Sequence, residues 1–371
     1  MKTTHIAASC LALCLSTIAT ASDSRRIAPT DPNIHFNGVL VKKTSPDGGL
    51  ELLRFPESLY ENVFRPRRKV VPGKPTQSKA RTTTGVEMLF KTDSDHARLF
   101  FKTPEGFEHR GANWRVLQNG KVWKDIDFKA RQREMTLDLV SETPGEPVVY
   151  TVVFPSWSDP FFYGIELDKG KKLLPYTPPK KPLYVAYGDS VSHGTGQRSA
   201  TYLTWPYKLA KKLGYDFHSL AVGGASIKPE VVESFKEFKK IDLITFYLGI
   251  NDSNNKTPEQ YKKAYDEALS IIRKYHPKTK IFCITIHTMP EGKKGRFAPM
   301  AAYRKPVEEI VAARRAAGDK NLFLVKGTEL VGLDGAATPG NVHLSIDGAD
   351  TWAKNLARII RKVERKGFRS P

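Results

Sequence analysis

The chain is 371 residues long, 40% hydrophobic and 26% charged, with a formal net charge of +20 at pH 7. This composition excludes an intrinsically disordered or fibrous protein, and the length suits two domains better than one. The positive charge is spread over both halves, +7 over residues 22–182 and +12 over residues 183–371. It indicates either an affinity for polyanions, such as an acidic polysaccharide, an anionic membrane or nucleic acid, or a solubility device alone.

The first 21 residues have the pattern of a signal peptide. Lys2 gives a short polar start, residues 6–18 are small and apolar, and the A-T-A sequence at 19–21 offers a cleavage site. Cleavage there would leave Cys283 as the one cysteine, and its apolar neighbours indicate a buried side chain rather than a catalytic thiol. No other stretch is long and apolar enough to span a bilayer. We therefore expect a secreted or periplasmic protein without a membrane span.

Residues 31–172 are predicted to form an all-β sandwich. Segments such as 86–90 and 135–140 alternate in the way of half-buried strands. The dipeptide Asn-Gly at 119–120 lies between two apolar runs and is a strong hairpin signal. No helical period of comparable strength is present, so we expect about eight strands. Prolines and lysines then predict a stiff linker at residues 173–182.

From residue 183 onward, apolar runs alternate with helical patterns. We expect buried strands and intervening helices at these positions: strands 183–187, 217–222, 243–248, 281–286 and 322–325, and helices 201–213, 258–275, 303–317 and 347–363. This alternation predicts an α/β domain over residues 183–367, with a parallel sheet covered by helices. Ligands of such folds bind at the carboxyl ends of the strands.

Four short motifs follow those strands or precede the last helix. They are Gly-Asp-Ser at 188–190, Gly-Gly at 223–224, Asn-Asp at 251–252 and His343. The first is not the G-x-S-x-G turn of other serine hydrolases, because its glycine and aspartate precede the serine directly. In this order the motifs resemble those of the SGNH, or GDSL-type, hydrolase superfamily. The resemblance covers residues 183–367 and implies a flavodoxin-like fold.

The resemblance also implies roles for individual residues. Ser190 would be the nucleophile and His343 its base, because a serine hydroxyl attacks an ester only when a base removes its proton. The backbone N–H groups of Ser190 and Gly224, with Gly223 the weaker match, and the side-chain amide of Asn251 would form the oxyanion hole. Fixed donors of this kind stabilise the negative charge of the tetrahedral intermediate.

One motif departs from the family pattern, in which an aspartate stands three residues before the histidine. Here that position is Gly340. Three alternatives stay open: a backbone carbonyl orients the imidazole, Asp334 takes the place of the aspartate, or the enzyme is weak or inactive. His193 is a less favoured alternative base, because the residues after such a serine usually point away from the site.

A sandwich followed by this hydrolase type is similar to exported sugar esterases, and Thr-Trp-Pro at 204–206 resembles that group. We therefore expect a serine esterase that removes acetyl or other short acyl groups from a polysaccharide, with an acidic polymer favoured by the charge. A lipid or thioester acylhydrolase, or a non-catalytic glycan-binding protein, is the alternative. The spacing of histidines and cysteines predicts no metal site, and no cofactor or nucleic-acid partner is expected.

Overall fold

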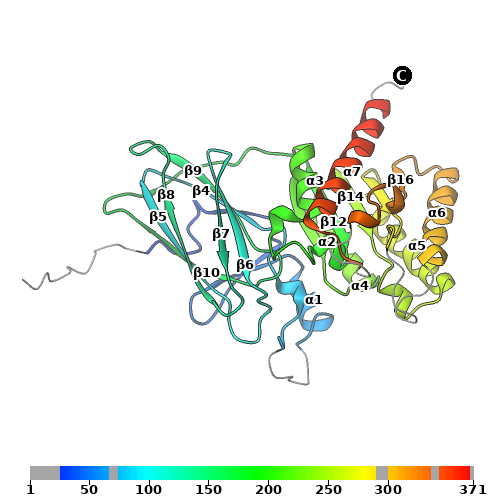
Figure 1. Ribbon diagram of the computed structural model, residues 1–371, viewed down its shortest axis with the longest axis horizontal. Helices are drawn as coiled ribbons and strands as arrows, with labels where there is room; N and C mark the ends of the chain where they lie inside the picture. The colour runs from blue at the N-terminus through cyan, green and yellow to red at the C-terminus, as the bar shows by residue number, and fades with distance from the viewer. Residues whose placement is uncertain (1–25, 67–73, 290–299, 336–341, 368–371) are drawn as a thin grey trace, which may run out of the picture.

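The computed structural model describes residues 26–66, 74–289, 300–335 and 342–367, and the predicted signal peptide lies outside them. Within these ranges, two antiparallel sheets pack together and are followed by an α/β domain built on a parallel sheet (Figure 1). The predicted fold class, a β-sandwich before a helix-covered parallel sheet, is therefore confirmed.

Each sheet of the sandwich is built from five main strands. The first sheet, in spatial order, contains β1 (His35–Asn37), β4 (Glu87–Thr92), β9 (Val148–Val153), β6 (Ala112–Gln118) and β7 (Lys121–Phe128), and β11 (Leu173–Leu174) pairs with β4. The second contains β2 (Val41–Thr44), β3 (Leu50–Leu53), β10 (Phe161–Leu167), β5 (His96–Lys102) and β8 (Glu134–Val140). Strand β8 alternates strictly between exposed and buried residues, so it carries one apolar face toward the other sheet.

The described residues contain more sandwich strands than the roughly eight expected from the pattern. The additional strands are short, such as the three-residue β1 and the two-residue β11. Strands of this length are too short to show a recognisable alternation in the sequence. Because β11 pairs with β4, the sandwich extends to Leu174, two residues into the segment expected to be a linker.

The α/β domain has a five-stranded parallel sheet. Its spatial order is β13 (Asp216–Ala221), β12 (Leu183–Gly188), β14 (Leu243–Tyr247), β15 (Lys280–Ile284) and β16 (Leu322–Val325). All four neighbouring pairs are parallel, so all five carboxyl ends lie at one edge of the sheet. The first strand in sequence, β12, lies between the second and the third, which brings the loops after these three strands together.

Helices connect these strands in the alternating order that the sequence predicts. The helices of the described chain are α1 (Glu57–Asn62), α2 (Ser190–His193), α3 (Trp205–Leu213), α4 (Pro229–Val232), α5 (Pro258–Tyr275), α6 (Met300–Ala316) and α7 (Ile346–Gly367), and the short 3-10 turns are η1 (Lys79–Arg81), η2 (Thr201–Leu203), η3 (Glu233–Glu237), η4 (Asp252–Asn254), η5 (Gly327–Glu329) and η6 (Leu333–Gly335). Helix α5 begins at a capping box formed by Thr257 and Gln260. No helix among the described residues is long and apolar enough to cross a membrane.

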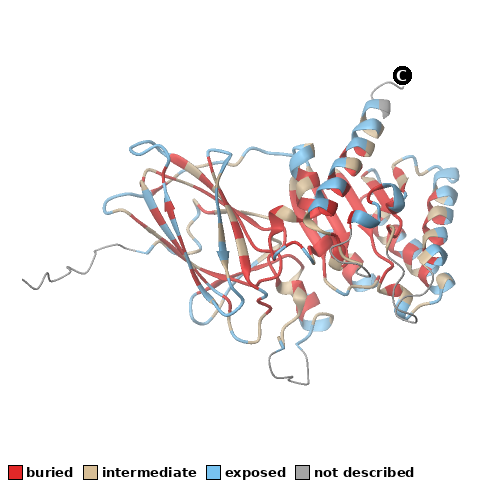
Figure 2. Ribbon diagram, viewed as in Figure 1, coloured by how far each residue is buried: buried red, intermediate tan, exposed pale blue. Residues whose placement is uncertain are grey.

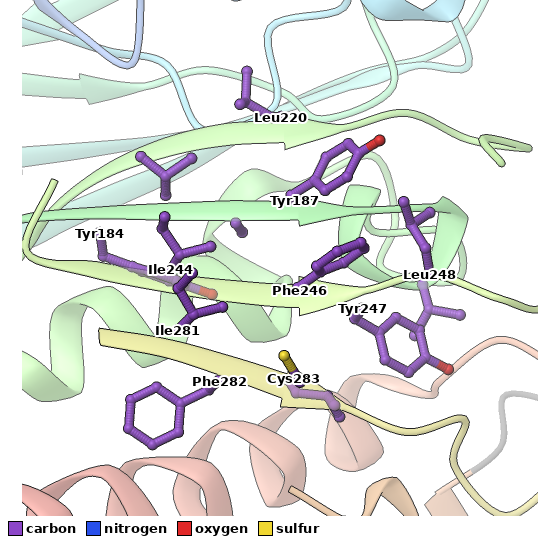
Figure 3. Packing of buried hydrophobic residues seen from close by; sticks show 14 of the residues in the cluster. Tyr184, Tyr187, Leu220, Ile244, Phe246, Tyr247, Leu248, Ile281, Phe282 and Cys283 are labelled. Carbon is purple, nitrogen blue, oxygen red and sulfur yellow. The ribbon is translucent and has the colours of Figure 1, made fainter. Parts of the chain in front are cut away.

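Burial is continuous from the sandwich into the α/β domain (Figure 2). One apolar cluster lies wholly between the two sheets of the sandwich, and a second fills the α/β domain. The second also includes sandwich-side residues such as Phe55, Tyr60 and Val153, so the two domains share buried surface. Figure 3 shows part of it, with Tyr187, Phe246 and the fully buried Cys283 packed on the parallel sheet.

Candidate active site

Four of the predicted site residues, Ser190, Gly224, Asn251 and His343, lie at the carboxyl edge of the parallel sheet. Ser190 begins α2 directly after β12, Gly224 lies in the loop after β13, and Asn251 follows β14. These three strands are neighbours in the sheet, so their loops are adjacent. His343 arrives from the segment before α7. Residues that are 153 positions apart in the chain are thereby brought into hydrogen-bonding contact.

The nucleophile turn is held by buried polar contacts. Asp189 caps α2, and its Oδ1 accepts a hydrogen bond of 2.9 Å from the Val191 N–H. Burial raises the pKa of Asp189 to about 7. Gly188 has no room for a side chain, because a Cβ atom there would lie 2.3 Å from the Ser192 hydroxyl oxygen. Ser190 itself is half-buried and can therefore meet a substrate.

Ser190 and His343 form a nucleophile–base pair in geometry. Ser190 Oγ lies 2.9 Å from His343 Nε2, the distance of a good hydrogen bond. Burial, and then the nearby positive charge of Arg110, lowers the pKa of His343 to about 4. The imidazole is therefore neutral at neutral pH, and its Nε2 can accept the serine proton.

This lowered pKa gives a pH prediction. The base must be neutral to act, so activity falls where His343 becomes protonated. We expect kcat/KM for a neutral aryl acetate to stay level down to about pH 5 and to have its acidic midpoint near 4, below the ordinary histidine value of 6.5. Initial rates measured from pH 3 to 8 check this, with residual activity at pH 7 after acid exposure as the control for unfolding. A midpoint at 6.5 or above would contradict the lowered pKa of His343.

The two predicted oxyanion donors of the loops after β13 and β14 are both accessible. Gly224 is exposed at a φ of +83°, and an added Cβ atom would meet nothing within 4 Å. The Gly223 N–H is already used, because it donates to His193 Nδ1 at 2.9 Å, which favours Gly224 as the donor. One hydrogen of the Asn251 amide is used for the Ala225 carbonyl at 3.0 Å, which leaves its second hydrogen for a ligand.

The structure does not bring Asp334 to the imidazole. Asp334 is exposed in η6, and among the described residues it makes no hydrogen bond or ion pair with His343. Gly340 and the carbonyls of residues 336–341 lie outside the described residues. Of the two candidates for orienting His343, a backbone carbonyl therefore remains the stronger proposal.

Asp334→Asn separates those two candidates. If a carbonyl orients His343, we expect kcat to change by less than about threefold, because an exposed surface amide replaces an exposed carboxylate. If Asp334 held the imidazole, the same change would lower kcat by orders of magnitude, because an amide favours the wrong tautomer of His343. Steady-state kinetics on an aryl acetate measures the difference, with the nearby exposed Glu329→Gln as the matched control.

His193, the less favoured base, has a structural role. It is fully buried, and burial lowers its pKa well below the usual range. Its Nε2 lies 2.8 Å from both the Ser156 carbonyl and the Thr82 hydroxyl, so this nitrogen carries the proton, and Nδ1 accepts from Gly223. His193 thus links the sandwich to the loop that carries Gly224.

Arg54 makes a second link between the domains at the same loop. Its fully buried guanidinium donates to the carbonyls of Thr82 and Ala80 on the sandwich side, and of Ser219 and Ala221 at the end of β13. Burial lowers its pKa to about 10, so it stays charged at neutral pH. A buried charge needs such hydrogen bonds, and here they fix the end of β13 against the sandwich.

A further buried pair supports the segment before α7. The Tyr247 hydroxyl lies 2.6 Å from His287 Nδ1, and the His287 ring donates to the Val342 carbonyl, next to His343. Burial lowers the pKa of His287 to about 3, so this ring stays neutral. His287 follows the fourth strand of the sheet, and nothing local in the sequence indicates its contact with Val342.

Arg110 and Trp157, which no sequence motif indicates, reach the site from the sandwich. The Arg110 guanidinium lies 3.9 Å from the centre of the Trp157 ring, and it is close enough to His343 to lower the pKa of that imidazole. Both residues precede the α/β domain in sequence, outside every motif of the resemblance. Aromatic and basic residues are common in strand-rich segments, so no sequence signal singled them out.

Comparisons with known proteins agree with this architecture. Residues 186–351 match the model of the GDSL-like Lipase/Acylhydrolase family. No curated protein sequence matched the chain. Among solved structures, the chain is similar to a salicylyl-acyltransferase, SsfX3, from a tetracycline biosynthetic pathway, with 21% identity, a TM-score of 0.78 and coverage of 93% of this chain and 98% of that one.

Two carbohydrate esterases of family two also share the whole arrangement. The enzyme from Clostridium thermocellum, solved in complex with cellohexaose, is 17% identical, with a TM-score of 0.63 and coverage of 89% and 98% of the two chains. The enzyme from Cellvibrio japonicus is 14% identical, with a TM-score of 0.65 and coverage of 92% and 98%. At these identities the similarity shows a shared fold that includes the sandwich.

Proposed function

Because residues 186–351 match the model of the GDSL-like Lipase/Acylhydrolase family, we propose that the protein is a serine esterase that removes acetyl or other short acyl groups from a polysaccharide. The observation that carries the proposal is the 2.9 Å contact between Ser190 Oγ and His343 Nε2. It occurs beside two accessible amide donors, the backbone of Gly224 and the side chain of Asn251.

The geometry supports a two-step acyl transfer. Ser190 Oγ attacks the ester carbonyl while His343 Nε2 takes its proton, and the carbonyl oxygen becomes negative. Gly224, Asn251 and the Ser190 N–H stabilise that oxygen. The tetrahedral intermediate then collapses, His343 returns the proton to the leaving sugar oxygen, and an acyl-serine remains. Water, deprotonated by His343, releases the acid and restores Ser190.

A carbohydrate substrate is supported by the similar solved structures and by the predicted signal peptide. The relatives from Clostridium thermocellum and Cellvibrio japonicus are carbohydrate esterases, and one of them was solved with cellohexaose. The predicted signal peptide at residues 1–21 would also place the protein where polysaccharides are met. The net charge of +20 favours an acidic polymer over a neutral one, because an oppositely charged surface concentrates it.

Release of acetate from a panel of acetylated glycans, neutral and uronate-containing, tests the proposal. We expect acetate from at least one polymer, and turnover that falls as the acyl chain is lengthened. A preference for long acyl chains or thioesters would favour the lipid or thioester acylhydrolase. Binding of a glycan without turnover of any ester would favour the non-catalytic alternative.

The same panel tests the acidic polymer. Raising the salt from 0.01 to 0.15 M shortens the Debye length from about 30 to about 8 Å. Activity on an acidic polymer should then decline through KM, while activity on a neutral aryl acetate stays nearly constant. If salt affects activity on the two substrates equally, the net charge serves solubility and not the binding of an acidic polymer.

A further inference from the structure

Trp157 is held between the neutral imidazole of His193 and the guanidinium of Arg110 at the edge of the site. The His193 ring stacks on it at 4.0 Å with an interplanar angle of 6°, and the Arg110 guanidinium carbon lies 3.9 Å above the ring centre. Both partners are within about 4 Å of the same centre, so they occupy opposite faces of the indole. Arg110 is therefore placed by stacking, and its backbone N–H donates to the Trp157 carbonyl at 3.0 Å.

The same tryptophan packs on the loop that carries Gly224. A Cβ atom on Gly223 would lie 2.2 Å from the Trp157 ring, so the glycine backbone rests directly against the indole. The Gly223 N–H is bound by His193, the partner on the ring's other face. Arg110 is thus separated from the loop of the oxyanion donor by one aromatic ring, and its charge acts on His343 as well.

The guanidinium is only partly satisfied by the protein. Its Nε donates to Glu108 Oε1 at 2.5 Å, and the side chain of Glu108 is almost fully buried. The two terminal nitrogens of Arg110 have no hydrogen-bond partner among the described residues, and its side chain is 45% exposed.

We propose that Arg110, fixed on Trp157, is the binding subsite for an anionic group, a carboxylate or a sulfate, carried by the substrate close to the ester that is cleaved. The inference rests on the proposed esterase function and names its substrate class. The planar edge formed by the terminal nitrogens of an arginine matches such a group in two parallel hydrogen bonds.

Electrostatics gives this subsite an effect on catalysis beyond binding. His343 must become an imidazolium in each transition state, and the neighbouring charge of Arg110 opposes that step. An anionic group bound to Arg110 would cancel the opposing charge at the moment when His343 takes the proton. An anionic substrate should therefore gain in kcat as well as in KM.

Two pairs of esters that differ in one charge test the subsite. On the acyl side, an aryl hemisuccinate is compared with the aryl butyrate. On the sugar side, an acetylated methyl glucuronide is compared with the acetylated methyl glucoside. We expect the kcat/KM ratio of anionic to neutral ester to exceed about tenfold in one pair, as for a charged hydrogen bond, and that pair identifies the source of the charge.

Substitution of Arg110 completes the test. Arg110→Gln should bring the kcat/KM ratio of anionic to neutral ester close to one. Arg110→Lys keeps the charge but not the planar edge, so it should keep part of the preference for the anionic ester. Arg98→Gln, which removes an exposed arginine paired with Asp138 on the outer part of the sandwich, should leave the ratio unchanged. Thermal midpoints show whether each variant is folded.

The outcomes separate the subsite from the esterase function. Turnover of the neutral esters without a preference for charge in either pair, or a preference that Arg110→Gln retains, overturns the subsite and leaves the esterase in place. If none of the four esters is turned over, the proposed function fails and the subsite fails with it.

Discussion

Ser190→Ala should lower kcat for a short aryl ester by about 10⁴-fold or more, as loss of the nucleophile does in serine hydrolases. The reason is that the hydroxyl forms the covalent acyl intermediate, and its oxygen lies 2.9 Å from His343 Nε2, the nitrogen that takes its proton. Residual turnover would come from the oxyanion donors and from binding alone. Burst kinetics on the wild-type enzyme and steady-state rates on the variant measure the effect.

A matched serine on the surface serves as the control. Ser270 is exposed on α5, so Ser270→Ala should keep full activity. The half-buried Ser190 loses only a hydroxyl in its variant, so the thermal midpoint should stay within a few degrees of the wild type. Undiminished turnover in a folded Ser190→Ala protein would remove this residue as the nucleophile and leave the glycan-binding alternative.

The fold could be predicted from the sequence because both of its parts have a simple periodicity. The strict alternation of β8 and the apolar runs of β12 and β14 correspond to strands of nearly the expected length and burial, whereas β15 ends at Ile284, two residues before the end of the expected strand. The strand–helix alternation then fixes a parallel sheet, and a parallel sheet fixes where its carboxyl ends meet. Short strands without alternation, such as β1 and β11, could not be predicted from periodicity.

The topology alone predicts the position of those site residues that follow neighbouring strands of the sheet. Ser190, Gly224 and Asn251 each follow a strand, so the topology alone places them together. Their roles, with that of His343, remain predictions that the variants test. The group that orients His343 could not be settled from spacing, since Asp334 is near His343 in sequence yet makes no hydrogen bond or ion pair with it among the described residues.

Contacts between the domains were not predictable, because the periodicity within the sandwich and within the α/β domain does not show how the two pack against each other. Arg54 in the sandwich region has no sequence feature that shows its four carbonyl partners, two of which belong to β13. The same is true of Trp157 and Arg110. The sandwich is therefore part of the site: it supports the loop of Gly224 and supplies the charge beside His343.

Asn251→Ala is expected to lower kcat by about 10²- to 10³-fold, the effect of removing one oxyanion donor. Asn251 is half-buried after β14, and its amide is held by a 3.0 Å hydrogen bond to the Ala225 carbonyl, in the loop that also carries Gly224. The amide is therefore fixed before the substrate arrives. The hydrogen bond from its second hydrogen to the substrate carbonyl oxygen becomes stronger as that oxygen becomes negative. The loss should fall on kcat, because the neutral ground-state carbonyl gains little from that donor.

Asn251→Asp sharpens the test, because it keeps the size of the side chain but replaces the donor with a carboxylate that repels the oxyanion. We expect it to be at least as damaging as Asn251→Ala, whereas Asn254→Ala, at an exposed position of η4, should behave as the wild type. Steady-state kinetics on a neutral aryl acetate gives kcat and KM separately for all three variants. A change confined to KM would make Asn251 a substrate-binding residue, and an unchanged kcat would leave the backbone of Gly224 and Ser190 as the donors that stabilise the oxyanion.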